Sequence, residues 1–318
     1  MTLERWQMKR RPARLFCAAL FHAGLWSVAL VISTQASQAA DDPAPTAEAS
    51  VPAEAKPEDK PAPPPSLFPD PALEAAVRAE VFEKRYNQEP LKPEDVKNVS
   101  RVVGRGKAIK SLEGLQQCPA LMLIDLHGNE ISDLTPISKL SKLQSVTLSN
   151  NKITDIAPLK ELTAMQLLDL SGNEVSDLGP LAAMKNLRTL YVARNKLTSL
   201  DPLKELTKIW SLDLSENQLT DLTPIAGLGW LTMLDVRRNQ IKALDPIASL
   251  RELDFLLLTG NQLEDIASLV AMCKKDAEGE KRFAPYMKVY LGENPLSETA
   301  KTEQVDALKK FGVKVFDE

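Results

Sequence analysis

One asparagine recurs every 22 residues through the middle of this 318-residue chain. Apolar residues keep fixed distances from it, as Leu121, Ile124 and Leu126 do ahead of Asn129. A strict period of this length predicts stacked structural repeats, because one such unit cannot bury its apolar face alone. The series, with one further member after an interruption, is Asn129, Asn151, Asn173, Asn195, Asn217, Asn239, Asn261 and Asn294.

Each repeat contains the pattern of one short strand. In Ile124-Asp125-Leu126 the two apolar residues are expected to point inward and the middle residue outward. Stacked units then pair these strands in parallel at ~4.8 Å per strand. The asparagine is expected to turn into the stack, where its amide satisfies backbone groups of neighbouring units.

Proline marks the return side of the repeats and fits the first turn of a short helix. Because each unit has so few residues, this position predicts 3₁₀ turns rather than long α-helices. Thr135, Asp201, Thr223 and Asp245 each precede one of these prolines and are expected to cap the turns. The prolines are Pro136, Pro158, Pro180, Pro202, Pro224 and Pro246.

Both ends of the stack need covers. Residues 67–118 are expected to form a helical cap, with helices beginning at Pro71 and Pro93, followed by the tail half of one repeat. Residues 119–272 hold seven full repeats. Residues 273–318 hold an insertion, a last strand and a C-terminal cap with a helix over 297–311 and a strand over 313–316. The insertion, which starts at Cys273, is expected to be a solvated loop.

The consensus L-x-x-L-x-L-x-x-N-x-L identifies residues 67–318 as similar to leucine-rich repeats with 22-residue units. Such repeats occur in bacterial internalins and in the regulatory subunit of protein phosphatase 1. The register of Ile131, Asp133, Leu134, Pro136 and Ile137, with a helical N-terminal cap, resembles the internalin group most. The resemblance implies an α/β solenoid: a curved parallel sheet with short 3₁₀ turns on its convex side, used for protein binding.

The first 39 residues have the pattern of an export signal. Five basic residues and one acid precede an apolar run over 15–32, and small residues follow at 37–40. The alternative is an uncleaved inner-membrane anchor, which would be the chain's membrane contact. Residues 40–66 include eight prolines and are expected to be a disordered Pro/Ala-rich linker. The chain is therefore expected in the periplasm, in the cell envelope or outside the cell, or anchored in the inner membrane facing outward.

Composition excludes several classes of protein. The net charge is −4, and removal of residues 1–39 leaves −8, which argues against nucleic acid as a partner. Two histidines and three cysteines leave little material for a metal site or a disulfide framework, and no motif indicates a cofactor. Cys118 and Cys273 lie about seven repeats apart, roughly 33 Å, and cannot pair within one chain. Cys118 is expected to be buried, and Cys273 more exposed.

Tyrosine, tryptophan and arginine gather at outward positions of the middle repeats. These residue types often anchor interfaces because they bury much area at a small entropic cost. The alternative is an unselected surface with local Asp–Arg pairs. The expected partner-binding residues are Tyr191, Arg194, Trp210, Asp213, Met233, Asp235, Arg237 and Phe255.

Three more specific chemical interpretations have less support from the sequence. Asp213 and Asp235 on adjacent repeats suggest a calcium site, but nearby arginines compete for their carboxylates. His127, Ser149 and Asp125 resemble a hydrolase triad, but an open sheet offers no enclosed pocket. A series of turn aspartates is better explained by local capping; it comprises Asp133, Asp155, Asp177, Asp221 and Asp265.

The sequence therefore predicts an exported, non-enzymatic scaffold that binds a protein or peptide on its concave face. The alternative is an envelope structural protein, or one that binds cell walls or glycans. The pattern assigns no oligomeric state and gives no function to the insertion over 273–284.

Overall fold

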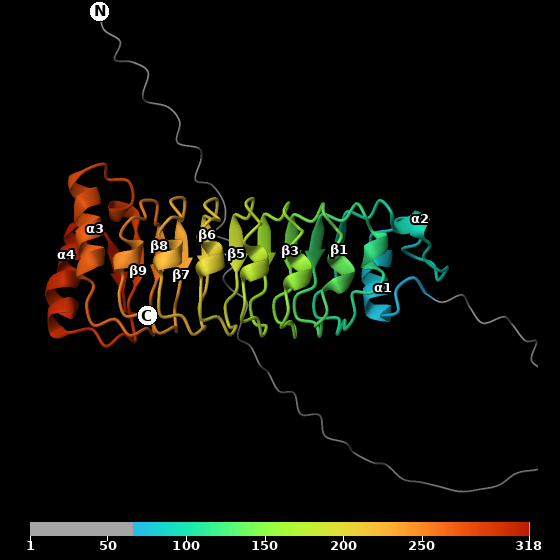
Figure 1. Ribbon diagram of the computed structural model, residues 1–318, viewed down its shortest axis with the longest axis horizontal. Helices are drawn as coiled ribbons and strands as arrows, with labels where there is room; N and C mark the ends of the chain where they lie inside the picture. The colour runs from blue at the N-terminus through green and yellow to red at the C-terminus, as the bar shows by residue number, and fades with distance from the viewer. Residues whose placement is uncertain (1–65, 318) are drawn as a thin grey trace, which may run out of the picture. The chain divides into compact units, whose positions relative to one another are not determined.

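The computed structural model describes residues 66–317 and contains one parallel sheet of ten strands in sequential order (Figure 1). Each strand pairs with the next repeat in register, so Ile124 lies beside Val146 and Val146 beside Leu168. The predicted leucine-rich repeat solenoid is confirmed. The strands are β1 (Arg101–Val103), β2 (Leu123–Asp125), β3 (Ser145–Thr147), β4 (Leu167–Asp169), β5 (Thr189–Tyr191), β6 (Ser211–Asp213), β7 (Met233–Asp235), β8 (Phe255–Leu257), β9 (Lys288–Tyr290) and β10 (Lys314–Phe316).

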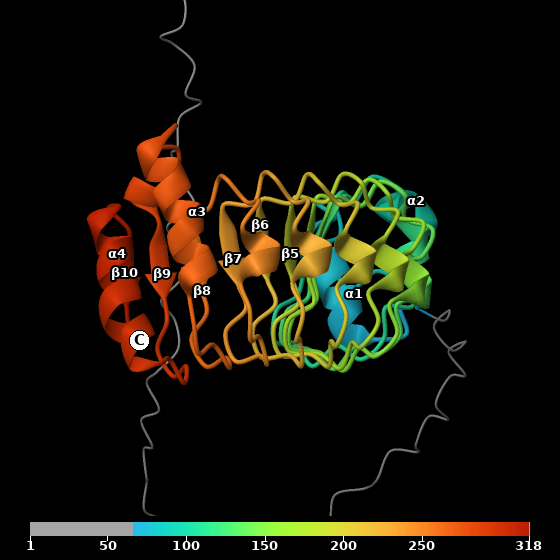
Figure 2. The ribbon, with the colours of Figure 1, turned by 60° about the vertical axis from the view of Figure 1, so that its left-hand side comes forward.

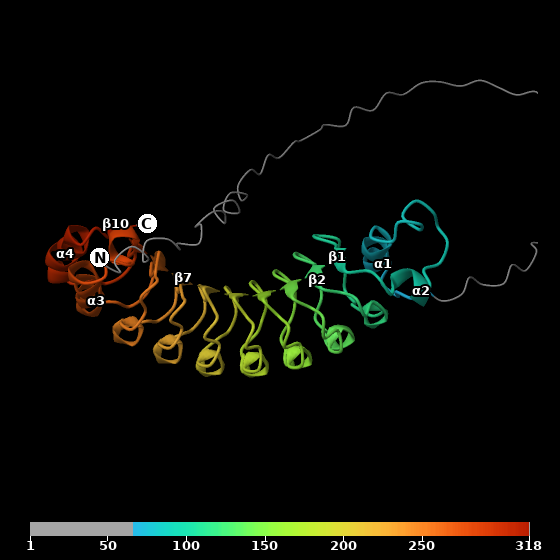
Figure 3. The same cartoon turned by 90° about the horizontal axis from the view of Figure 1, so that it is seen from above.

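The repeats follow an arc, with strands on its concave side and short 3₁₀ turns on its convex side (Figures 2 and 3). A three-residue turn is narrower than an α-helix, so it fits a unit of only 22 residues. The turns are η1 (Leu115–Gln117), η2 (Thr135–Ile137), η3 (Ala157–Leu159), η4 (Gly179–Leu181), η5 (Asp201–Leu203), η6 (Thr223–Ile225), η7 (Asp245–Ile247) and η8 (Ala284–Tyr286).

The core runs as one continuous apolar column between the sheet and the turns. In a typical unit Leu190, Val192 and Leu203 are completely buried. They come from the strand, from the residue just after it and from the turn, so each repeat closes its own section of the core. Because every section also packs against the next, the stability of each unit depends on its neighbours.

The asparagines form the predicted amide ladder. The Asn195 amide nitrogen donates to the carbonyl oxygens of Leu170 and Val192 at 3.0 and 3.1 Å, and its oxygen accepts from the Val175 N–H at 2.9 Å. The same contacts recur from Asn129 to Asn294. One side chain thus satisfies backbone groups of two successive repeats.

The residue before each ladder asparagine adopts a left-handed backbone, which the sequence pattern did not reveal. Glycine occupies this position in three units, but Arg194 (φ 52°), Glu216 (φ 55°) and Arg238 (φ 52°) occupy it elsewhere. Such a conformation costs a non-glycine residue free energy, and the surrounding ladder must hold it in place.

Asp capping of the turns is confirmed, whereas the expected caps at Thr135, Asp201, Thr223 and Asp245 are wrong. Thr135 and its equivalents are the first residues of the turns. Asp133 accepts from the Thr135 N–H at 2.8 Å, two residues ahead. The same contact recurs at Asp155, Asp177, Asp221 and Asp265. An Asx turn of this kind needs the carboxylate before the first N–H, so the cap lies earlier than expected.

The N-terminal cap contains helices α1 (Pro71–Arg78) and α2 (Pro93–Val96), as predicted. The repeat that follows is more than a tail half, because β1 pairs with β2. Its ladder position holds Lys107 instead of asparagine, and this loss of the marker hides the strand in the sequence. Ser66, assigned to the linker, donates to Glu74 of α1 at 2.6 Å and belongs to the cap.

The first half of the C-terminal insertion is helical and not a loop. Helix α3 (Ala267–Glu278) begins before it and continues through Cys273, so the boundary at 273 falls inside a helix. Cys273 is completely buried, contrary to expectation, because it lies on the inner side of α3 with Leu269 and Met272. A π-helical turn, η9 (Ala300–Gln304), leads into α4 (Val305–Lys310), and β10 closes the sheet as expected.

The export signal and the linker, apart from Ser66, lie outside the described residues. Among the helices of residues 66–317, none has the length and apolar character needed to cross a membrane.

Candidate binding face

The predicted binding residues lie on or beside four adjacent strands of the concave face, β5 to β8. Tyr191, Asp213 and Asp235 are direct neighbours in one row across these strands. Met233 and Phe255 are neighbours in a second row, two residues earlier along each strand. The rows form the middle of the concave face, so the structure brings these five residues together.

Trp210 and Arg194 lie at opposite edges of the same face. Trp210 directly precedes β6, whereas Arg194 follows β5 by three residues. The Arg194 guanidinium donates to Asn150, two repeats back, at 3.2 Å, and not toward Trp210. A partner would have to cross the full width of the sheet to touch both residues.

Two aromatic rings are accessible on this face. Trp210 is 42% exposed and Phe255 is 39% exposed, whereas Tyr191 is half-buried. The Tyr191 hydroxyl lies 3.2 Å from the Ser211 hydroxyl, and the Lys288 ammonium lies 4.8 Å from the centre of the Phe255 ring. These contacts fix the rings without covering them.

Asp235 serves the fold more than the surface. Its side chain is completely buried and forms a 2.6 Å ion pair with Arg237, whose guanidinium remains partly exposed. Burial and the neighbouring Asp235 charge raise the pKa of the Asp213 carboxyl, although Ser215 donates both its N–H and its hydroxyl to Asp213. Asp235 therefore positions Arg237, whose charge also acts on Asp213, although Asp213 forms no ion pair among the described residues.

The suggested calcium site gains no support from these contacts. Arg237 occupies Asp235, and Ser215 occupies one oxygen of Asp213. Within residues 66–317, no three His, Cys, Asp or Glu side chains are grouped so that they could hold a metal ion.

The resemblance to a hydrolase triad is wrong in both membership and order. Ser149 lies in the middle, donating to Asp169 at 2.8 Å with its oxygen 3.0 Å from His127. In a triad the histidine lies between the acid and the serine, where it takes the serine proton. Here the Ser149 hydroxyl donates its hydrogen bond to Asp169. Asp125 forms an ion pair with Arg105 instead.

Four matches to a family model for leucine-rich repeats in pairs span residues 123–161, 141–183, 163–205 and 185–227. Internalin C2 of Listeria monocytogenes is 32% identical, with a TM-score of 0.62, over 65% of this chain and 91% of that one. The chain is a leucine-rich repeat protein. Its repeats resemble those of internalins. No curated protein matches it.

Two more distant leucine-rich repeat structures share the fold alone. One, from Leptospira interrogans, is 22% identical with a TM-score of 0.56, over 65% of this chain and 57% of that one. The other is the plant peptide hormone receptor RGFR1 in complex with RGF2. It is 24% identical with a TM-score of 0.52, over 64% of this chain and 33% of the receptor.

Four exposed aromatic residues of the leucine-rich repeat protein were missed from the sequence, and one of them, Tyr286 in η8, is 49% exposed. Trp230 is 72% exposed, and Phe82 and Tyr86 on the N-terminal cap are 81% and 90% exposed. Trp230 follows Gly227 and Gly229 at a position that holds Lys208 and Asn186 in the two preceding repeats, and that break in the pattern was the available signal. Phe82 and Tyr86 lie outside the repeats, where no register assigns a face.

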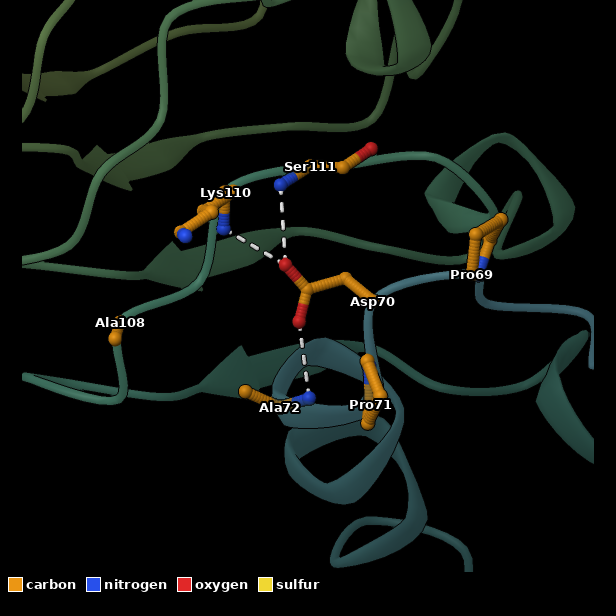
Figure 4. Close-up of a pocket in the computed structure, with 7 residues that line it drawn as sticks. All are labelled: Pro69, Asp70, Pro71, Ala72, Ala108, Lys110 and Ser111. Atoms are coloured by element: carbon orange, nitrogen blue, oxygen red, sulfur yellow. Dashed lines mark hydrogen bonds between the residues drawn. The ribbon is translucent and has the colours of Figure 1, made fainter.

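The hollow beside α1 is structural (Figure 4). Asp70 accepts from the Ala72 N–H at 2.9 Å and from the Lys110 and Ser111 N–H groups at 2.7 and 3.1 Å. Although burial alone would raise the pKa of Asp70, these backbone hydrogen bonds lower it. The carboxylate caps α1 and fastens it to the first leucine-rich repeat.

Proposed function

We propose that this leucine-rich repeat protein is an exported, non-enzymatic scaffold that binds a protein or peptide on the concave face of β5 to β8. The observation that carries the proposal is the exposure of Trp210 and Phe255 there. Large aromatic rings left open to water on an otherwise regular sheet favour burial against a partner.

The chemistry of the face supports binding rather than catalysis. Its candidate nucleophile, Ser149, donates its hydroxyl hydrogen bond to Asp169, so this hydrogen is not directed at His127, 3.0 Å away. The ion pair between Asp235 and Arg237 holds a guanidinium on the same face, at the edge where the strands end. Arginine in such a position suits an acidic side chain or a backbone carbonyl of a partner.

Export is supported by the sequence of residues 1–39 alone. A basic flank followed by an apolar run and small residues is the pattern of a secretory signal. We place the repeats in the cell envelope or outside the cell, with the proline-rich segment as the spacer that holds them away from the membrane.

The test is quantitative affinity capture from the native envelope, with the intact mass of the mature chain measured in the same sample. A Tyr191→Ala/Trp210→Ala/Phe255→Ala variant is expected to lose the partner that the unaltered protein retains. Phe82→Ala/Tyr86→Ala removes exposed aromatic area from the cap and is the matched control. Equal capture by both variants would move the binding site away from the concave face.

A glycan ligand is the second candidate, because Trp210 directly precedes β6 and the Asp213 carboxylate lies at its last residue. Sugars combine ring stacking with hydrogen bonds to carboxylates. A glycan array run beside the capture experiment separates the two: the protein proposal requires a captured polypeptide, and the glycan candidate requires array signal that the triple variant loses.

A further inference from the structure

The two long edges of the repeat stack carry opposite charge. Because the strands are parallel, the segments that enter the strands lie along one edge and the segments that leave them lie along the other. We call the entering segments of β3 to β6 the basic edge: residues 138–144, 160–166, 182–188 and 204–210. The basic edge has seven lysines and arginines against two glutamates. The cations, all exposed, are Lys139, Lys142, Lys160, Lys185, Arg188, Lys204 and Lys208.

The opposite edge is acidic. It consists of the seven-residue segments that start at each ladder asparagine from Asn129 to Asn261. These segments carry ten acids and three lysines. A chain of net negative charge thus concentrates its positive charge on one side of the sheet.

The acidic edge forms ion pairs within the molecule, whereas Lys185 and Lys208 of the basic edge donate only to neutral oxygens, those of the Glu205 carbonyl and the Asn186 amide. The turn aspartates of the acidic edge cap backbone N–H groups, and Glu130 and Glu174 pair with Lys152 and Lys196. In the described part of the chain, none of the seven cations of the basic edge forms an ion pair. The free positive charge is therefore available to an external anion.

Tryptophans continue the rows of cations. Trp230 occupies the register position of Lys208 one repeat later, and Trp210 occupies that of Arg188. The neighbouring backbones are in contact, since the Trp210 N–H donates to the Arg188 carbonyl at 2.9 Å. Each row thus passes from a cation to an exposed aromatic ring.

Amide side chains complete the same rows. Asn186 precedes Lys208 in one row and accepts a hydrogen bond from its ammonium at 2.9 Å. Gln144 and Gln166 precede Arg188 in the other row, and their side chains are joined at 3.4 Å. Cations, amides and tryptophans therefore follow one another along a narrow strip.

We propose that the basic edge, continued by Trp230, binds a linear acidic polysaccharide. The lysines and arginines would pair with carboxylate or sulfate groups, the amides would hydrogen-bond hydroxyl groups, and the indole ring would stack on a sugar face. The two rows that lead to Trp210 and Trp230 run along the stack from one repeat to the next, and such a linear track fits a single polymer chain better than a broad lipid surface. This surface meets the concave face at Trp210, but the proposal does not rest on the function proposed for that face.

The test uses the full chain with heparin as the acidic polysaccharide, neutral dextran as the uncharged control and duplex DNA as the non-sugar polyanion. Heparin is expected to bind, with affinity falling as salt rises because counterions are released. Dextran is expected not to bind. Lys185→Glu/Arg188→Glu/Lys208→Glu should weaken heparin binding by about tenfold or more.

The matched control is Lys152→Glu/Lys196→Glu/Lys242→Glu, which makes the same change in net charge on the opposite edge. Its heparin affinity is expected to stay within about threefold of the unaltered protein, since it leaves the basic edge intact. Equal losses in both triple variants would show a response to net charge and overturn the proposal. Urea unfolding of each variant confirms that it is folded.

Trp230→Leu distinguishes sugar recognition from simple charge attraction. It is expected to weaken heparin binding several-fold while leaving the weaker binding of duplex DNA unchanged, because it removes a stacking surface and no charge. Unchanged heparin affinity in this variant, or DNA binding as tight as heparin binding, would overturn the assignment to a polysaccharide. Because the variant retains Tyr191, Trp210 and Phe255, failure here leaves the concave-face proposal untouched.

Discussion

The side-chain oxygen of Asn217 accepts a hydrogen bond from the backbone N–H of Leu197, 20 residues earlier, at 3.0 Å. Its amide nitrogen donates to the Val192 and Leu214 carbonyls at 2.9 and 3.0 Å. Asn217→Ala leaves the buried Leu197 N–H without its partner, whereas Asn195 and Asn239 still donate to the two carbonyls. It is expected to lower the free energy of unfolding by about 1–3 kcal/mol. Urea denaturation measures the loss. Gln218→Ala, at the exposed next residue, should change it by less than about 0.5 kcal/mol.

Gly114 holds the N-terminal cap against the first repeat. Its φ of 101° is unfavourable for other residues, and a Cβ atom there would lie 2.4 Å from Phe68 Cδ1 and 2.6 Å from the Leu67 carbonyl oxygen. Gly114→Ala should therefore cost about 2–3 kcal/mol of unfolding free energy. Gly229→Ala is the control, since its Cβ atom meets nothing within 4 Å. Comparable unfolding midpoints for the two variants would contradict this role for Gly114.

Asp70 should make the cap sensitive to acid. The pKa of its carboxyl is lowered in the folded protein, so its stabilisation is complete above the ordinary value of 3.8 and is lost as the pH falls through the lowered value. Asp70→Ala should cost about 1–2 kcal/mol at pH 7, and less as the pH drops below 3.8. Unfolding curves at several pH values test this, with the exposed Glu303→Ala as a comparison. A difference independent of pH would contradict the mechanism.

Asp213 should change the pH dependence of stability in the opposite direction to Asp70. Burial and the Asp235 charge raise the pKa of the Asp213 carboxyl, so its ionised form is disfavoured in the folded chain. Stability falls as the pH rises from 3.8 through the raised value, and the penalty persists at neutral pH. Asp213→Asn is expected to increase the free energy of unfolding at pH 7 and to show little gain at pH 4. A variant less stable than the unaltered protein at pH 7 would reject this account.

The two buried cysteines should be unreactive in the folded protein. Burial raises the pKa of the Cys118 thiol to about 11, and burial with the Asp276 charge raises that of Cys273 to about 12. The thiolate is the reactive form, so at pH 8 neither peptide should take up iodoacetamide until urea unfolds the chain. Mass spectrometry of the digested protein reads each site separately. Labelling of Cys273 in the native state would show that α3 opens readily.

The sequence predicted most of the fold because one repeated amide fixes the position of every strand near it. That logic failed where the marker is absent. Lys107 replaces the asparagine of the first unit, so β1 was missed, and the longer interval before Asn294 concealed α3 and the burial of Cys273. The pairing of β1 and the burial of Cys273 under α3 depend on tertiary packing that a periodic pattern does not encode.

The repeat register predicted the strands on which the candidate residues lie, but it did not predict their burial or their contacts. The register placed Tyr191 and Asp213 side by side, yet it did not reveal that Asp235 is buried beneath Arg237. Burial at an outward position depends on the side chains of the adjacent strands. Trp230 was missed because exposure at the edge of a repeat depends on the small residues around it, here Gly227 and Gly229.

Helix α3 shows how such a protein can acquire new parts. Eleven additional residues separate Asn261 from Asn294, yet β8 and β9 still pair in register and the amide of Asn294 still reaches Leu258. The extra length leaves the strand side undisturbed. Evolution or protein design can therefore insert whole segments at the outer turns without changing the strand pairing and amide contacts that hold the repeats together.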